Sequence, residues 1–150
     1  MGARRAAGAS ERGQSLVEFA LLTPLLIILL IGLFDAARAV WLSNTLATAA
    51  REGTRYAIVH GSASALPSGP GAPSYTPPNS DTAVEAVVAR YAVGVSGLSV
   101  SATWPDGNNS RGSRVIVTAR APFAPVVSEA FIGAAFRITL RSGSEMVIHR

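Results

Sequence analysis

The sequence predicts an α+β protein, in which one long N-terminal helix packs on a small antiparallel sheet of about three strands together with a second helix. Three observations support this fold class. An uncharged apolar run near the N-terminus continues into apolar residues spaced by three and four, a second helical pattern follows a proline-rich stretch, and the last third of the chain alternates apolar with polar residues. With 150 residues the chain has room for one domain besides a membrane segment.

The composition favours a membrane protein. Hydrophobic residues make up 49% of the chain and charged residues 15%, whereas soluble proteins carry roughly 25% charged residues. The chain has no cysteine, which excludes a disulfide framework and thiolate metal sites and leaves the redox compartment open. The net charge of +4 comes from scattered arginines without a basic stripe, so no nucleic acid is expected as a partner.

The N-terminal segment predicts a single membrane-spanning helix. Residues 1–13 are small, polar and basic, and we expect them to be a solvated, disordered leader. No residue from Phe19 to Phe34 is charged, and a helix from Leu16 to Phe34 can cross a hydrocarbon core of about 30 Å. Because the basic residues precede the span, the N-terminus is expected in the cytoplasm and the remainder outside the inner membrane.

Two residues in this segment are unusual for a plain anchor. An ionised side chain at mid-bilayer costs about 2.5–3.5 kcal/mol. Glu18 therefore either lies at headgroup depth, where it favours the positive end of the helix, or is kept for a partner charge in an assembly. Pro24 cannot donate a hydrogen bond to the carbonyl of Ala20 and should kink the helix, although the hydroxyl of Thr23 would restore part of the lost bonding.

The helix is expected to continue beyond the membrane, so that residues 14–60 form one helix capped by Gly61. Asp35 and Arg38, just after the span, are expected to form a solvated i,i+3 pair, with an intersubunit contact as the alternative. The second part of the helix is amphipathic, with an apolar stripe formed by Leu42, Leu46, Ala49, Gly53, Tyr56 and Ala57.

Residues 61–80 are rich in proline, glycine and serine and predict a flexible loop or linker. An extracytoplasmic α+β domain is assigned to residues 81–150. Its first element is a helix that begins near Thr82, which forms a capping box with Glu85. The helix ends at Gly94 or Gly97, and its apolar face consists of Val84, Val87, Val88 and Tyr91.

The rest of the domain predicts three antiparallel strands from its alternating pattern. The first covers residues 98–104, and a Pro-Asp-Gly-Asn-Asn turn joins it to the second, residues 114–120, which ends before Pro122. A short helix is expected over residues 128–135, and the last strand runs over residues 136–148.

No constellation of residues predicts catalysis, a cofactor or a metal, so the protein is not expected to be an enzyme. The segment from Asp106 to Ser110 spaces oxygen ligands as a calcium loop does, but Val117 stands where that loop ends in glutamate, so a hairpin turn is predicted. His60 and His149 have no second ligand at a metal-site spacing. Nucleophile-elbow and phosphate-loop patterns are absent from the sequence.

Two N-terminal stretches resemble a known family. They read RGQSLVEFAL at residues 12–21 and AAREGTRYA at residues 49–57, and weaker matches read VTARAPF at 117–123, FRITL at 136–140 and EM at 145–146. With these stretches the chain resembles the TadE-like family, which comprises pseudopilins (minor pilins) of the tight adherence, or Flp, type IVb pilus system. The resemblance implies a pilin-like fold and a role in pilus assembly, adhesion and secretion.

The resemblance also implies roles for particular residues. A dedicated prepilin peptidase would cut between Gly13 and Gln14, which leaves Glu18 as the fifth residue of the mature chain. In related pilins this glutamate pairs with the free amine of a neighbouring subunit, so the resemblance favours an assembly role for Glu18. Phe19, where the major pilins have tyrosine, suits the minor branch. The implied partners are the peptidase, other pilins or pseudopilins, the membrane assembly platform and the lipid bilayer.

Two alternatives remain open. One is a secreted soluble protein with a cleaved Sec signal, because the small-x-small pattern at residues 37–39 allows removal before Val40. Against it stand Glu18 and an apolar run longer than the usual 7–15 residues. The other alternative is a membrane-anchored binding protein.

Overall fold

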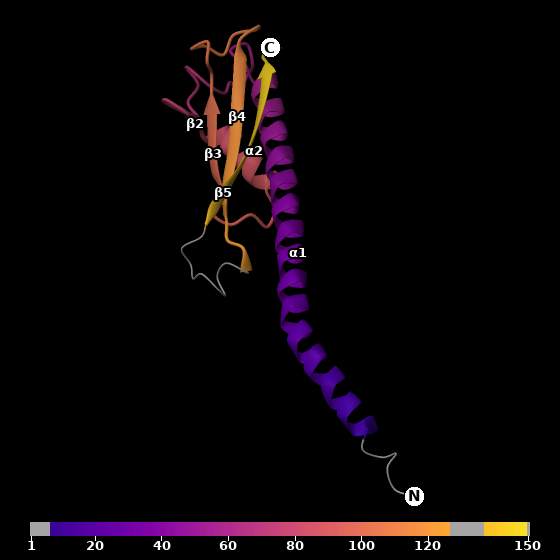
Figure 1. Ribbon diagram of the computed structural model, residues 1–150. Coiled ribbons are helices and arrows are strands. Elements are labelled where there is room, and N and C mark those ends of the chain that lie inside the picture. The colour runs from indigo at the N-terminus through magenta and orange to yellow at the C-terminus, as the bar shows by residue number, and fades with distance from the viewer. Residues whose placement is uncertain (1–6, 127–136, 150) are drawn as a thin grey trace, which may run out of the picture. The chain divides into compact units, whose positions relative to one another are not determined.

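The computed structural model describes residues 7–126 and 137–149, and its elements confirm the predicted α+β class (Figure 1). Two helices accompany a two-stranded and a three-stranded antiparallel sheet. The helix predicted over residues 128–135 lies outside the described residues. In chain order the elements are α1 (Ala7–Val59), β1 (Tyr75–Thr76), β2 (Ser80–Asp81), α2 (Thr82–Tyr91), β3 (Ser99–Thr103), β4 (Arg114–Phe123) and β5 (Ile138–Val147).

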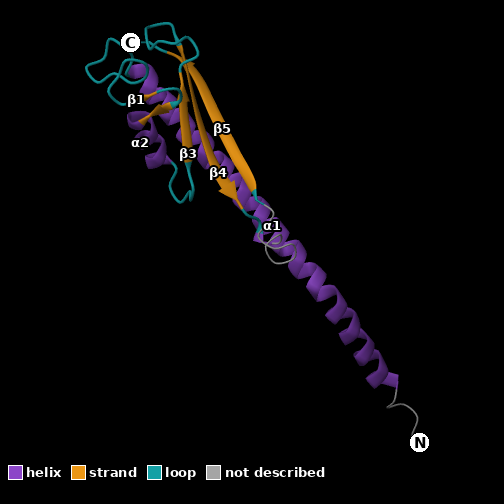
Figure 2. Cartoon of the chain, turned by 90° about the vertical axis from the view of Figure 1, so that its left-hand side faces the viewer, coloured by secondary structure: helices purple, strands orange, loops and turns teal. Residues whose placement is uncertain are grey.

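The chain divides into two compact units, and α1 contributes to both. The first consists of Met1–Ala37 with Pro125–Phe136, and the second of Arg38–Ala124 with Arg137–Arg150. In the second unit the C-terminal part of α1 lies along the strands of the larger sheet (Figure 2). This unit contains the hydrophobic core of the described residues.

Helix α1 differs from its predicted bounds at both ends. It begins at Ala7, so the expectation of a disordered leader is wrong for residues 7–13. The alanine, glutamate and arginine of this stretch are good helix formers, and the helix extends through them. At the other end α1 stops at Val59, and Gly61 lacks the positive φ of a helix-capping glycine. The carbonyl of His60 instead accepts hydrogen bonds from the backbone nitrogen and hydroxyl of Ser68 (2.7 and 3.2 Å).

The larger sheet has the order β3-β4-β5, with every pair antiparallel as predicted. Residues of β4 that face the helices alternate with residues on the opposite face, and the former are buried. The buried set consists of Val115, Val117, Ala119, Ala121 and Phe123.

The prediction that the second strand ends before Pro122 is wrong, because Pro122 pairs with Thr139 within β4. The physical reason lies in the register. The pairing of β4 with β3 stops at Arg120, opposite Ser99, so β4 has a neighbour on one side only beyond that point. A proline, which lacks a backbone N–H, is tolerated in such an edge position.

Both helices cover the same face of this sheet and meet at Gly53 of α1. A Cβ built on Gly53 would lie 2.4 Å from Cγ2 of Val88 on α2 and 3.3 Å from Cγ1 of Val117 on β4. The hydroxyl of Thr54, the next residue, donates to the carbonyl of Ser144 on β5 (3.2 Å). The absence of a side chain at Gly53 therefore allows the close approach of α1 to α2 and β4.

Helix α2 is capped by Asp81 and not by the predicted Thr82. The Asp81 side chain accepts from the backbone nitrogens of Ala83 (3.0 Å) and Val84 (3.2 Å). Glu85, the other half of the predicted capping box, accepts a hydrogen bond from the hydroxyl of Ser80 instead (2.6 Å). Aspartate is as good an N-cap as serine. It caps the helix from the position just before the first helical residue and does not require the glutamate of a capping box.

The proline-rich stretch between the helices contains a short hairpin that the sequence did not predict, formed by β1 and β2. The second carboxylate oxygen of Asp81 holds this stretch, because it accepts from the backbone nitrogen of Gly69 (2.6 Å) and the hydroxyl of Ser74 (3.2 Å). Asn109 binds the stretch from the other side, since its amide donates to the carbonyl of Ser68 (2.9 Å). Buried polar atoms of the loop are thus hydrogen-bonded.

The segment between β3 and β4 forms the predicted hairpin turn. The carboxylate of Asp106 accepts hydrogen bonds from the backbone nitrogen of Arg114 (2.8 Å) and from its guanidinium (2.9 Å). This guanidinium holds the pKa of Asp106 below its ordinary value, and the carboxylate raises the pKa of Arg114. The side chain of Asn108 bonds Ser110 and Ser113 of the same turn. The acidic and amide oxygens here therefore serve the turn itself.

Candidate processing and assembly site

The residues expected to take part in processing and assembly all lie on the N-terminal part of α1, within the first unit. Gly13, Gln14, Glu18 and Phe19 are exposed on this helix. The side-chain amide of Gln14 donates to Oε1 of Glu18 (3.2 Å). This bond follows from the helix, which brings residues four apart onto one face. The spacing of four residues between Gln14 and Glu18 in the sequence was therefore sufficient to predict this hydrogen bond.

The surroundings of Gly13 are open. A Cβ built there meets no heavy atom within 4 Å. The bond between Gly13 and Gln14 is nonetheless inside a helix, and a peptidase needs an extended backbone at the bond that it cuts. Glycine costs a helix about 1 kcal/mol relative to alanine. The helix is therefore weakened at the predicted cleavage position.

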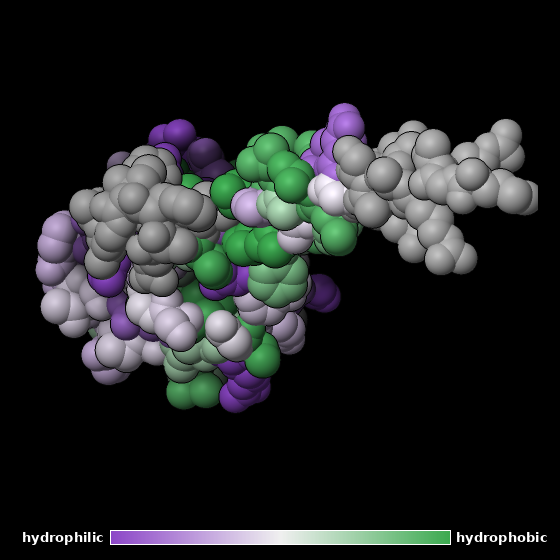
Figure 3. Space-filling view, turned by 60° about the horizontal axis from the view of Figure 1, so that its bottom comes forward, coloured by the Kyte–Doolittle hydropathy of each residue, from purple (hydrophilic) through white to green (hydrophobic). Residues whose placement is uncertain are grey.

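The helix that follows is apolar on all sides, and the other described residues do not cover it. Among the described residues it is the one helix long and apolar enough to span a membrane, and no side chain of its most apolar window is buried. In Figure 3 green, hydrophobic side chains cover much of this helix. The exposed large side chains are Leu16, Val17, Phe19, Leu21, Leu22, Leu25, Leu26, Ile27, Ile28, Leu29, Leu30, Leu33 and Phe34.

Pro24 lies inside α1, as the sequence requires. The predicted restoration of the lost bonding by Thr23 is not observed. Its hydroxyl donates to the carbonyl of Phe19 (2.7 Å), and not to the carbonyl of Ala20 that Pro24 leaves without its helical donor. A kink at Pro24 stays a prediction.

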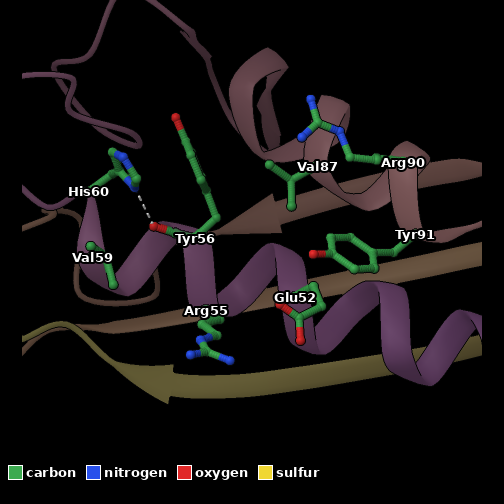
Figure 4. Close-up of a pocket in the computed structure, with 8 residues that line it drawn as sticks. All are labelled: Glu52, Arg55, Tyr56, Val59, His60, Val87, Arg90 and Tyr91. Atoms are coloured by element: carbon green, nitrogen blue, oxygen red, sulfur yellow. Dashed lines mark hydrogen bonds between the residues drawn. The ribbon is translucent and has the colours of Figure 1, made fainter.

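A groove of about 310 Å³ lies between α1 and α2 in the second unit and contains none of the predicted site residues (Figure 4). At one end His60 stacks on Tyr56, with 3.9 Å between ring centroids, and its Nδ1 lies 2.8 Å from the Tyr56 carbonyl oxygen. His60 thus lies directly after the end of α1. Tyr91 and Glu52 line the groove towards its other end. The described residues include no group of three histidine or acidic side chains placed to hold a metal ion.

An exposed apolar helix joined to a small α+β unit defines the class of protein: the described residues contain one candidate membrane span and one folded unit. The model of the TadE-like protein family matches residues 13–55, which confirms the predicted resemblance over this segment. The match begins at the predicted cleavage glycine and covers all the predicted site residues. No curated protein and no solved structure matches the chain.

Proposed function

We propose that this protein is a minor pilin or pseudopilin that takes part in assembly of a tight adherence pilus after a prepilin peptidase has cut between Gly13 and Gln14. The observation that carries the proposal is the coincidence of the family match, which starts at Gly13, with a bare apolar helix that carries Glu18 near its beginning. An apolar helix that the other described residues leave uncovered is suited to lipid or neighbouring subunits around it. The role is structural and does not require a catalytic group.

The proposed assembly contact is an ion pair between Glu18 and the new amine of Gln14 in a neighbouring subunit. A carboxylate at the edge of an apolar environment is tolerated when a cation meets it. In the uncleaved chain Glu18 has a neutral partner, the amide of Gln14. Cleavage adds a positive charge next to that amide, at the N-terminal end of the shortened helix, where the helix dipole has its positive pole. Processing therefore provides the charge that the carboxylate requires.

Gly13→Val is expected to block processing, because a branched side chain at the scissile position adds bulk and removes the flexibility of glycine. The measurement is N-terminal sequencing of the mature chain together with its shift on a gel. The wild-type chain should begin at Gln14 and the variant should stay full-length. Gly32→Val is the matched control, because Gly32 lies on the same helix and also has no heavy atom within 4 Å of a built Cβ.

A mature chain that begins at Val40 would overturn the proposal in favour of a cleaved secretory signal. Processing of Gly13→Val at the wild-type position would exclude the assigned peptidase step. A wild-type chain that keeps Met1 in its host would leave a plain anchored protein.

Glu18→Ala is expected to leave membrane insertion unchanged and to reduce incorporation into the pilus assembly at least about tenfold, because a buried amine left without its partner costs several kcal/mol. Incorporation is measured by the amount of the chain that purifies with sheared pili or with the assembly complex. Glu18→Asp, which keeps the charge, should retain most incorporation. Equal incorporation of the alanine and wild-type chains would remove the role assigned to this carboxylate.

A further inference from the structure

The second unit has an exposed apolar cluster at the end where α1 enters it. Val40 and Trp41 on α1 are 62% and 53% exposed, and Val93, in the connection between α2 and β3, is 72% exposed. We call these three residues the entry cluster. Solvent-exposed apolar residues that gather in this way mark an interaction surface.

The connection that carries Val93 approaches the Trp41 side chain at Gly94. Gly94 has a φ of +75°, and a Cβ built on it would lie 3.3 Å from Cη2 of Trp41. The glycine therefore lets the backbone of the α2–β3 connection approach the indole ring, and Val93 is the residue before this point of approach. The connection and the residues on either side of it, from Tyr91 to Val100, carry no charge.

A cation lies near this end of the unit. The guanidinium carbon of Arg38, three residues before Trp41, is 5.4 Å from the ring centroid of Phe123 at the end of β4. Arg137, just before β5, is exposed. An uncharged apolar surface with arginine at its margin is the composition found where proteins contact lipid headgroups.

The position of Trp41 along α1 decides between lipid and another protein as the occupant. Trp41 follows Phe34, the last residue of the uncharged run, by seven residues of one continuous helix. Seven residues correspond to about 10 Å, and helical side chains lean back towards the N-terminus. The indole is thus expected within the headgroup layer, which extends about 5–8 Å beyond the hydrocarbon core. Tryptophan is enriched at this depth.

We propose that the entry cluster is a membrane-contact surface, by which Trp41 and Val93 seat the folded unit on the outer headgroup layer of the bilayer that α1 crosses. The inference rests on the membrane insertion that the proposed function requires. In this proposal the α2–β3 connection contacts the lipid in addition to the membrane-spanning part of α1.

The test uses the full chain reconstituted in phosphatidylcholine vesicles that contain lipids brominated near the headgroup. The chain has two tryptophans, so Trp104→Phe leaves Trp41 as the only indole. Trp104 is 5% exposed, and its Nε1 has no hydrogen-bond partner among the described residues. The phenylalanine therefore removes no hydrogen bond. Trp41→Phe is the matched control, because it leaves only the buried Trp104.

Quenching of Trp41 by the brominated lipid should exceed quenching of Trp104 at least about twofold, and Val93→Asp in the Trp104→Phe background should reduce the quenching of Trp41. Resistance of each chain to alkaline extraction from the vesicles is measured in parallel. If the two indoles are quenched equally in chains that resist extraction, the proposed membrane-contact surface is wrong, while the membrane span is retained. If Trp41 is quenched at a low protein-to-lipid ratio and this quenching is lost at a high ratio, the surface would be assigned to contact with a second copy of this chain instead. Extraction of the wild-type chain would overturn the proposed function as well.

Discussion

Replacement of Asp81 by alanine is expected to be among the most destabilising single changes in the folded unit, with a loss of about 2–4 kcal/mol. Asp81 is fully buried, and its two carboxylate oxygens accept four hydrogen bonds, three of them from backbone nitrogens. Alanine removes the cap of α2 and also leaves the buried nitrogen of Gly69 without a partner. One carboxylate thus joins the helix start to the proline-rich stretch.

The measurement is thermal or urea unfolding of the detergent-solubilised chain, followed by circular dichroism. Asp81→Asn keeps one acceptor oxygen and should fall between the wild type and Asp81→Ala. Asp106→Ala is the matched control, because that carboxylate also accepts several hydrogen bonds but lies at an exposed turn. Its loss should cost clearly less than the loss of Asp81, because solvent screens the interactions of an exposed carboxylate. An Asp81→Ala chain as stable as Asp106→Ala would contradict the role given to Asp81.

Gly53→Leu is expected to separate α1 from α2 and β4 and to destabilise the folded unit by about 3 kcal/mol or more, beyond the usual cost of overpacking. Even a single added carbon lies 2.4 Å from Val88 and 3.3 Å from Val117. Helix propensity favours leucine over glycine by nearly 1 kcal/mol, which is too little to offset the clash. Gly53→Ala should therefore also destabilise, by a smaller amount.

Limited proteolysis and the unfolding midpoint measure this effect. Gly32→Leu makes the same chemical change on the same helix at a site without neighbours within 4 Å, so its stability should stay at the wild-type value. If Gly53→Leu and Gly32→Leu unfold at the same denaturant concentration, the close packing at Gly53 is not important for stability. Gly53 lies inside the segment that matches the TadE-like family model.

Sequence patterns were reliable where a single physical rule decides the structure. The uncharged run has no stable state in water other than burial in lipid or protein, so its prediction as an apolar helix followed directly. The strict alternation in the last third predicted the three strands and their antiparallel order, since each strand has one face on the core. The turn at Asp106 was predicted because aspartate, glycine and asparagine favour such geometry by themselves.

Predictions failed where the outcome depends on distant parts of the chain. A proline ends a strand that has neighbours on both sides, but the register leaves β4 unpaired with β3 beyond Arg120, so Pro122 stays within β4. Asp81 was missed as a helix cap because Thr82 and Glu85 offered a good local alternative. Its second oxygen binds Gly69, twelve residues earlier, which no local pattern shows. The entry cluster was missed for the same reason, because Trp41 and the α2–β3 connection come together at Gly94 only in the folded unit.

By itself the sequence determined that the chain has a long apolar helix, that an acid stands at its beginning and that an α+β unit follows, because these depend on the order and period of apolar residues along the chain. Only the tertiary structure decided which residues cap, which glycine permits close packing and which exposed side chains share a surface. Those features depend on atoms that lie far apart in sequence, and their energies arise only when the fold brings them within a few ångströms of each other.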